Sequence, residues 1–192
     1  MNARLTLVAH ASTAATSRVA FGADEGLEPR GAAAAAGSRL RRVSRAVCSP
    51  ARAAVEMAAA LGLAATVDAG LADWQLGGWR GRTLDEVAAD HPDDVAAWLG
   101  DPDAAPHGGE SLTALLARVA DWLARTDGGG HAVAVTHAAV VRAAVVATLG
   151  APPAGFWRID VAPLTATVLR GGPGRWTVRG TALPLDASSG GR

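Results

Sequence analysis

Three short apolar runs that alternate with helical patterns constrain the fold of this 192-residue chain most strongly. Each run has the length and the partly β-branched content of a buried strand. The runs cover residues 5–9, 45–49 and 131–135. The helical patterns that alternate with them cover residues 29–40, 50–61 and 138–149. Strands that alternate with helices predict an α/β sandwich of three layers, built around a largely parallel central sheet.

Between the second and third runs the sequence predicts a loop followed by helices. Residues 67–82 carry glycines and tryptophans without a period, which is typical of a long functional surface loop. Thr83 is a helix cap before a short helix that ends at Asp90, and Pro92 begins another helix. Residues 110–125 have the spacing of one apolar stripe on a helix.

The C-terminal part of the chain is predicted to form an antiparallel hairpin. Residues 165–170 and 176–179 are strand-like runs on either side of a Gly-Gly-Pro-Gly turn. They would add an antiparallel edge to the sheet. We expect one domain over residues 1–185 and a flexible tail over residues 186–192.

Composition excludes several classes of function. Eighteen basic residues balance eighteen acidic ones, and no basic run is longer than Arg41-Arg42, so we expect no nucleic-acid partner. The absence of lysine excludes Schiff-base chemistry and the lysine of a P-loop. The single Cys48 excludes a disulfide framework and indicates a reducing, cytoplasmic location. No apolar run is long enough to span a membrane, so we expect no membrane partner.

The predicted strands end in polar residues that carry chemistry. His10 follows the first run, residues 49–52 follow the second, and His137 follows the third. Ligands of open parallel sheets bind at the carboxyl ends of the strands, so these residues are expected to share one site. The histidines lack the spacing of a metal site, and no glycine-rich dinucleotide motif follows a strand. We therefore expect neither a metal nor a cofactor.

Five motifs in this order resemble the landmarks of the histidine phosphatase superfamily, which has the phosphoglycerate mutase-like fold. They lie at residues 10–13 (HAST), 49–53 (SPARA), 71–81 (LADWQLGGWRG), 107–111 (HGGES) and 135–138 (VTHA). The resemblance covers residues 5–149, and the third and fourth motifs are its most specific parts. The chain is more similar to the phosphatase branch, which includes ribazole-phosphate phosphatases, than to the glycolytic mutases.

The resemblance implies hydrolysis of a small phosphorylated metabolite through a phosphohistidine. In this family the histidine after the first strand accepts the phosphoryl group, and that position is His10. Arg52 matches the arginine that binds phosphate, and His137 matches the second histidine, which stabilises the phosphoryl group. Asp73 stands at the acidic position that protonates the leaving oxygen, where most members carry Glu. Thr16 replaces an asparagine and is expected to contact phosphate.

The chain also departs from the family pattern. Ala9-His10-Ala11 stands in place of Arg-His-Gly, so the first phosphate-binding arginine is missing. Alanine also replaces glycine at position 138, and we expect the methyl groups of Ala11 and Ala138 to lie beside the pocket. Loss of one preorganised donor costs a factor of about 10²–10³ in rate, which predicts a slow enzyme.

The sequence leaves five alternatives open. Glu110 could replace Asp73 as the acid or cap its own helix, and Arg82 could supply the missing cation. The chain could be a catalytically silent pseudophosphatase or binding module that has kept the fold. It could also be an enzyme of the same fold that acts on a substrate without phosphate. Both a monomer and a homodimer are compatible with the sequence.

Overall fold

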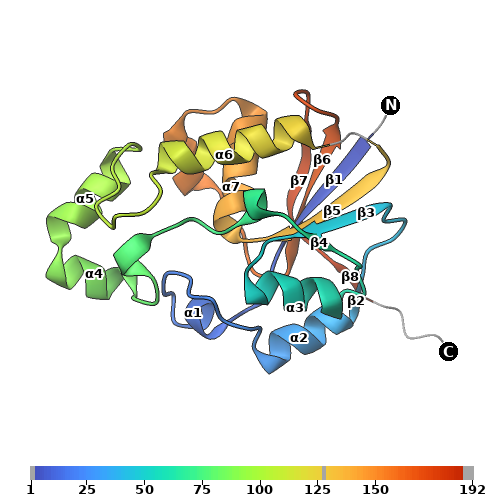
Figure 1. Ribbon diagram of the computed structural model, residues 1–192, viewed down its shortest axis with the longest axis horizontal. Helices are drawn as coiled ribbons and strands as arrows, with labels where there is room; N and C mark the ends of the chain where they lie inside the picture. Colours follow the sequence, from blue (N-terminus) through green and yellow to red (C-terminus); the bar gives the residue numbers. More distant parts are fainter. Residues whose placement is uncertain (1–2, 127–128, 188–192) are drawn as a thin grey trace.

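A six-stranded sheet forms the centre of the molecule in the computed structural model, which describes residues 3–126 and 129–187 (Figure 1). The strand order is β4-β3-β5-β1-β6-β7. Strands β4, β3, β5 and β1 are parallel to one another, whereas β6 is antiparallel to β1 and β7 is antiparallel to β6. The strands are β1 (Ala3–Ala9), β3 (Arg45–Cys48), β4 (Thr66–Val67), β5 (His131–Thr136), β6 (Thr165–Gly171) and β7 (Thr177–Pro184). The predicted parallel sheet with an antiparallel edge is confirmed.

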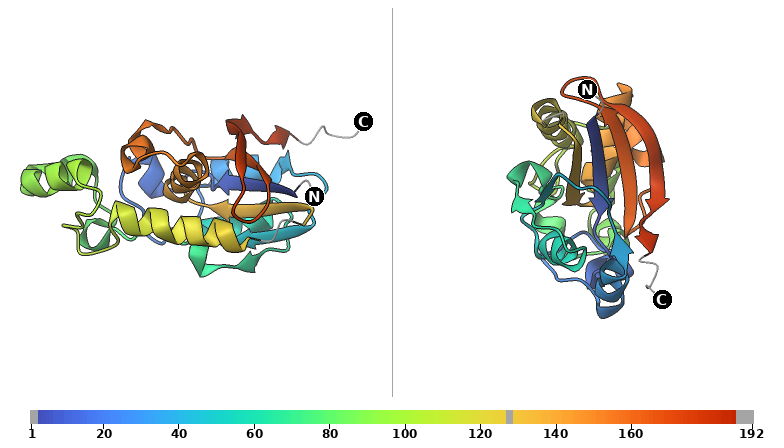
Figure 2. Two further views of the ribbon diagram at one scale, coloured as in Figure 1. Left: turned by 90° about the horizontal axis from the view of Figure 1, so that it is seen from above. Right: turned by 90° about the vertical axis from the view of Figure 1, so that its right-hand side faces the viewer.

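Helices cover both faces of this sheet, as the two views of Figure 2 show. One face packs against α2 (Pro29–Ala36) and α3 (Arg52–Ala60), and the other against α6 (Leu112–Arg125) and α7 (Ala138–Leu149). Successive strand residues point to opposite faces. Leu7 of β1 accordingly joins the core beneath α6 and α7, whereas Val8 joins the core beneath α3.

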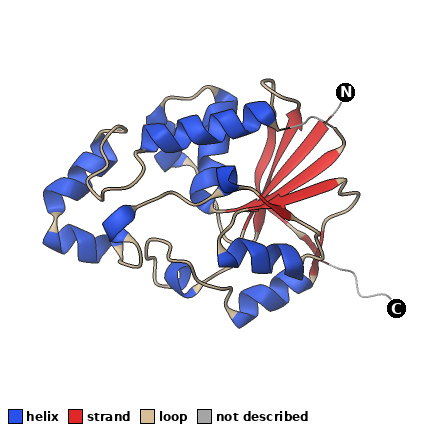
Figure 3. Cartoon of the chain, viewed as in Figure 1, coloured by secondary structure: helices blue, strands red, loops and turns tan. Residues whose placement is uncertain are grey.

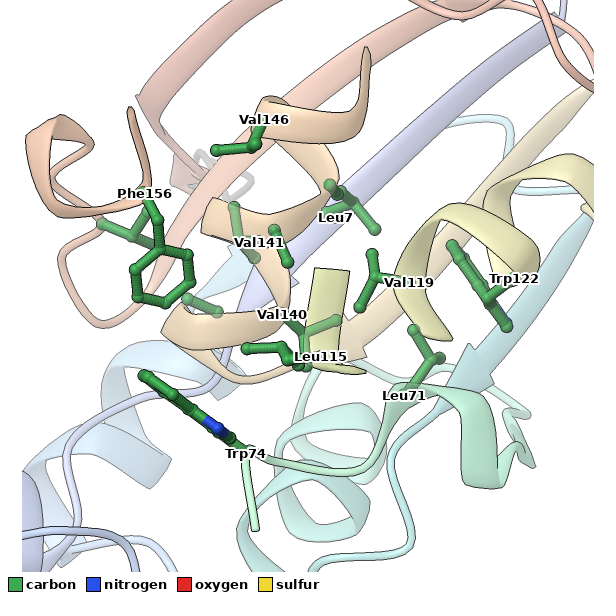
Figure 4. Packing of buried hydrophobic residues seen from close by; sticks show 14 of the residues in the cluster. Leu7, Leu71, Trp74, Leu115, Val119, Trp122, Val140, Val141, Val146 and Phe156 are labelled. Atoms are coloured by element: carbon green, nitrogen blue, oxygen red, sulfur yellow. The ribbon is translucent and has the colours of Figure 1, made fainter. Parts of the chain in front are cut away.

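The larger core lies between the sheet and the α6–α7 layer (Figure 4). Leu115 and Val119 of α6 contact this core from one side, and Val140 and Val141 of α7 enter it from the other. Trp122 is also buried there, as its helical spacing predicts. None of the helices in the described residues has the length and hydropathy needed to cross a membrane.

A group of short elements lies beyond the carboxyl edge of the sheet. Figure 3 shows α4 and α5 as the helices farthest from the strands. The group comprises α1 (Ala14–Ser17), η1 (Ala69–Leu71), η2 (Gly77–Trp79), α4 (Leu84–Asp90), α5 (Pro92–Gly100) and η3 (Pro153–Arg158). Thr83 caps α4 in a capping box with Glu86, which confirms the predicted helix start.

The structure changes two predicted boundaries. The helix expected over residues 29–40 ends at Ala36, because Ser38–Arg39 forms β2 and pairs with β8 (Asp186–Ala187). The expected tail over residues 186–192 therefore begins with a strand, and residues 188–192 lie outside the described residues. The pairing joins segments almost 150 positions apart, so no local pattern indicates it.

Two glycines hold the loop around Asp73 against the loop around Glu110. A side chain at Gly109 would collide with the carbonyl of Gln75, and one at Gly77 would collide with the carbonyl of His107. The close approach allows the amide of Glu110 to donate to the Gln75 carbonyl over 2.7 Å. Glycine is required at both positions because the backbones touch, and Gly77 also has a positive φ of 45°.

Candidate active site

Two adjoining hollows open at the carboxyl edge of the sheet. We call the first the apolar cavity; it has a volume of about 430 Å³. We call the second the polar cleft; its volume is about 320 Å³. The cleft is lined by residues 22–24, 49–51 and 72–75 together with Arg80 and His137. Asp73 and His137 line both hollows, so these two side chains mark the point where the hollows meet.

The sheet brings His10 and His137 together. His10 follows β1 and His137 follows β5, and these strands are parallel neighbours with Ala9 opposite Thr136. The backbone amide of His10 also donates to the Thr136 carbonyl over 2.9 Å. His10 Nε2 lies 3.2 Å from His137 Nδ1, with the two rings edge to face. The predicted meeting of the two histidines therefore follows directly from adjacent parallel strands.

Hydrogen bonds define which ring nitrogens carry protons. His10 Nδ1 donates to the Ala11 carbonyl over 2.8 Å, because a carbonyl oxygen can only accept. In the neutral imidazole this leaves a lone pair on His10 Nε2. His137 Nδ1 lies 3.2 Å from this nitrogen and donates to its lone pair, so His137 Nε2 carries no proton and accepts from the Ser49 hydroxyl over 2.8 Å. The Nδ1–H of His137 faces both His10 and the carboxylate of Asp73, whose Oδ2 lies 3.3 Å away.

Burial keeps the His137 ring neutral. Removal from water lowers the pKa of His137, and the guanidinium of Arg118 lowers it further. The carboxylate of Asp73 acts in the opposite direction on this pKa, but burial is the larger effect. A neutral His137 can donate from Nδ1 toward an oxygen in the hollow while it accepts from Ser49.

Asp73 is partly exposed where the two hollows meet. Its side chain is 33% exposed, and its Oδ1 accepts a hydrogen bond from the Trp74 amide over 2.8 Å. The other oxygen faces His137. The described residues contain no group of three or more His, Cys, Asp or Glu side chains placed to hold a metal ion.

Arg52 does not reach the hollows. Its Nε lies 2.7 Å from Glu56 Oε1, and its side chain is 67% exposed. Glu56 also accepts the amide of Leu27, and Asp24 accepts the amide of Arg52. These bonds join the start of α3 to the loop before α2, and they turn the Arg52 guanidinium away from His10.

The remaining predicted phosphate contacts fall into two groups. Thr16 lines the apolar cavity, where its hydroxyl is part of a capping box with Thr13 at the start of α1. Arg82 pairs with Asp90 and donates to the Glu86 carbonyl, so it faces α4 and lines neither hollow. Arg80, from the same loop, lines the polar cleft instead.

Glu110 forms a bidentate ion pair with Arg118 of α6. Both carboxylate oxygens lie 2.8 Å from guanidinium nitrogens, and the Glu110 side chain is only 14% exposed. Arg118 also donates to the carbonyls of Gly70 and Ala72. Ser111, rather than Glu110, caps α6. This arrangement favours a positioning role for Glu110, because it holds the loop that carries Asp73.

The alanines of the altered motif do not all face the site. Ala9 and Ala138 line the apolar cavity, as expected for Ala138. The expectation for Ala11 is wrong, since its methyl group lies against Gly31 of α2 in the smaller core. The chain turns after His10, and the next side chain therefore points toward α2 instead of the hollow.

Sequence reasoning missed several residues of the hollows. Ser49 was placed at the site without a role, although it is the hydrogen-bond partner of His137. Arg142 lines the apolar cavity, although its only signal in the sequence is a charge within an otherwise apolar helix. Phe156 and Trp157 carry no signal, because η3 is short and lacks a period.

Comparison with known proteins assigns the family. Residues 5–183 match the family model described as histidine phosphatase superfamily, branch 1. The chain belongs to this superfamily. The resemblance seen in the five motifs is therefore confirmed, and the superfamily match extends through the hairpin to within ten residues of the C-terminus.

Two proteins that are similar to this chain are glucosyl-3-phosphoglycerate phosphatases. The chain is 35% identical over 114 residues to the glucosyl-3-phosphoglycerate phosphatase of Mycobacterium tuberculosis (strain CDC 1551 / Oshkosh). That match covers 54% of this chain and 51% of the relative, so the chain spans about half the length of the curated relative. A mycobacterial glucosyl-3-phosphoglycerate phosphatase solved with inorganic phosphate is 30% identical, with a TM-score of 0.77 and coverage of 95% of this chain and 98% of that one.

A third relative shares the fold of this histidine phosphatase-family chain. The alpha-ribazole phosphatase from Shigella flexneri has a TM-score of 0.84 and covers 97% of this chain and 100% of its own. At 20% identity this likeness shows the fold alone. The phosphoglycerate mutase-like sandwich is thus established for the described residues.

Proposed function

We propose that this chain hydrolyses the phosphate monoester of a small metabolite through a phosphohistidine at His10, without a metal ion. One observation carries the proposal. The Ala11 carbonyl holds Nδ1 of His10, which leaves the lone pair of Nε2 at the hollow beside a neutral His137. An imidazole oriented through its other nitrogen is the arrangement that a histidine nucleophile requires. Family membership and phosphatase relatives support the same reading.

The reaction would run in two balanced steps. His10 Nε2 attacks phosphorus, the bond to the ester oxygen breaks, and the acid form of Asp73 gives its proton to that oxygen. Water then attacks the phosphohistidine while the Asp73 carboxylate accepts a proton from it, which releases phosphate and restores both residues. His137 Nδ1–H is placed to bind a phosphoryl oxygen during both steps.

The cations around the phosphoryl group are fewer than the resemblance implies. Position 9 is Ala, and Arg52 is engaged by Glu56. Arg80, which lines the polar cleft, supplies one positive charge near Asp73 and His137. Since one lost donor costs a factor of about 10²–10³, we expect slow turnover.

The test is hydrolysis of 4-nitrophenyl phosphate by the purified chain in the presence and absence of EDTA. We expect slow release of phosphate at a rate that the chelator leaves unchanged, because His10 and not a metal-bound water attacks phosphorus. Activity that appears only when magnesium or zinc is added would contradict the proposal.

A catalytically silent binding module is the second candidate. The engagement of Arg52 by Glu56 and the absence of an arginine at position 9 favour it. The same assay separates the two candidates when a broad panel of phosphate esters is added. Binding of inorganic phosphate together with no turnover on the whole panel would support the binding module.

Asp73→Asn is expected to slow esters with poor leaving groups by about 10²–10⁴-fold and activated aryl esters much less. A nitrophenolate leaves without a proton, whereas an alkoxide needs one from the acid. The measurement compares kcat for 4-nitrophenyl phosphate with kcat for an alkyl phosphate. Glu110→Gln serves as the matched carboxylate control, and we expect it to slow both esters alike. Equal losses on both esters for Asp73→Asn would show that Asp73 is not the acid.

A further inference from the structure

Aromatic rings form much of the wall of the apolar cavity. The Trp98 ring lies 5.2 Å from that of Trp74 and 4.9 Å from that of Trp157, between ring centroids. Phe156 continues the wall beside Trp157 at 5.1 Å, and Phe21 contacts Trp98 from the other side at 5.7 Å. All five rings line the cavity. A ligand group that lies against these rings therefore meets apolar faces.

One cation interrupts this apolar wall. Arg142 of α7 lines the cavity, and its guanidinium carbon lies 5.7 Å from the centre of the Phe156 ring. Its Nε is buried and makes no hydrogen bond, and no carboxylate among residues 3–126 and 129–187 forms an ion pair with it. A half-buried charge without a partner is costly, so the site is completed by an anion from outside the chain.

Arg142 lies against the aromatic wall of the cavity that also contains His10. Asp73 and His137 line both hollows, whereas Arg142 lines only the apolar cavity, where its guanidinium lies over Phe156. Glu25 also lines this cavity and is held by the amide of Ala15 over 2.8 Å. One unpaired arginine in a cavity that already holds a carboxylate matches a ligand group of single negative charge better than a second phosphate.

We infer that the substrate is a phosphate monoester whose alcohol part is largely apolar or aromatic and ends in a carboxylate bound by Arg142. The inference rests on the proposed phosphatase function and names the substrate class of the same site. The aromatic wall packs against the apolar part. The planar guanidinium pairs with the carboxylate, a group whose geometry fits its fork of donors.

The test compares matched ester pairs that differ only at the far end. One pair is 3-(4-phosphonooxyphenyl)propionate and its amide, and the other is the phenylacetate homologue and its amide. The methylene spacers keep the two leaving groups of each pair nearly equal in acidity. We expect the wild-type chain to prefer the acid of at least one pair by about 10- to 100-fold in kcat/KM, as for a charged hydrogen-bonded pair.

Three variants assign that preference. Arg142→Gln is expected to reduce the ratio of acid to amide to about one, and Arg142→Lys is expected to give an intermediate ratio because it keeps the charge without the fork. Arg158→Gln is the control, because Arg158 is exposed at the end of η3 and does not line the cavity. We expect this variant to keep the full ratio of acid to amide. Circular dichroism shows whether each variant is folded.

Two results would overturn the inference. One is a wild-type ratio near one for both pairs. The other is an equal loss on acid and amide in Arg142→Gln or Arg142→Lys, which would place Arg142 at the phosphoryl group instead. If no ester is hydrolysed, the proposed function fails. The inference is then tested by ligand binding, which is measured through tryptophan fluorescence. The wild-type chain should then bind 3-phenylpropionate more tightly than 3-phenylpropionamide, and equal affinities would overturn it.

Discussion

His10→Ala is expected to lower kcat by about 10³-fold or more on every phosphate ester that the wild-type chain hydrolyses. The variant loses Nε2 of His10, whose lone pair faces the hollow and the Nδ1–H of His137, whereas Nε2 of His137 accepts from Ser49. The measurement is kcat for 4-nitrophenyl phosphate, together with trapping of the phosphoryl group on the denatured protein. The trapped group should be lost in acid and stable in alkali, as expected for a phosphorylated imidazole.

His91→Ala is the matched control for this prediction. His91 lies on the surface between α4 and α5, where it faces Asp94, and it lines neither hollow. We expect wild-type kcat and wild-type trapping for this variant. Residual activity of His10→Ala above a few percent, with a phosphoryl group still trapped, would assign the nucleophile to another residue.

Arg118→Met is expected to lower the free energy of unfolding by about 3–5 kcal/mol, a large share of the 5–15 kcal/mol typical of such domains. The change leaves the Glu110 carboxylate without its partner at a position where the Glu110 side chain is 14% and that of Arg118 25% exposed. It also removes the donors to the carbonyls of Gly70 and Ala72. Chemical denaturation monitored by tryptophan fluorescence measures the loss.

A second substitution separates the ion pair from the rest of this effect. Glu110→Gln in the Arg118→Met background removes the unpaired charge, so the double variant should be more stable than Arg118→Met alone. Arg125→Met, at the last turn of the same helix, is the control and should cost less than about 0.5 kcal/mol. A loss below about 1 kcal/mol for Arg118→Met would show that the pair does not hold the loop.

The five longer strands, the main helices and the meeting of the two histidines could be predicted because each depends on local pattern. A short apolar run indicates a buried strand wherever it lies in the chain, and the capping sequence at Thr83 defines its helix start within four residues. His10 and His137 each follow such a run, and the rule that parallel strands share a carboxyl edge places them together.

The direction of each site side chain was decided by contacts between distant segments. Arg52 turns to Glu56 because the loop at Leu27 and Asp24 packs against the start of α3, and no pattern around Arg52 encodes that loop. The Ala11 methyl group likewise faces Gly31 because α2 covers that side of the chain. The sequence named these residues but could not orient them.

The strand pattern and the motifs predicted the sandwich, the family and the meeting of the two histidines. The apolar cavity, in contrast, forms only when distant segments pack together. Its aromatic wall combines residues from the loop before α2, the loop around Asp73, α5 and η3. Each of these residues has the local pattern of an ordinary core or loop position. Only the packing of segments up to about 140 residues apart places them around Arg142, because such contacts depend on the whole fold and leave no periodic trace in the chain.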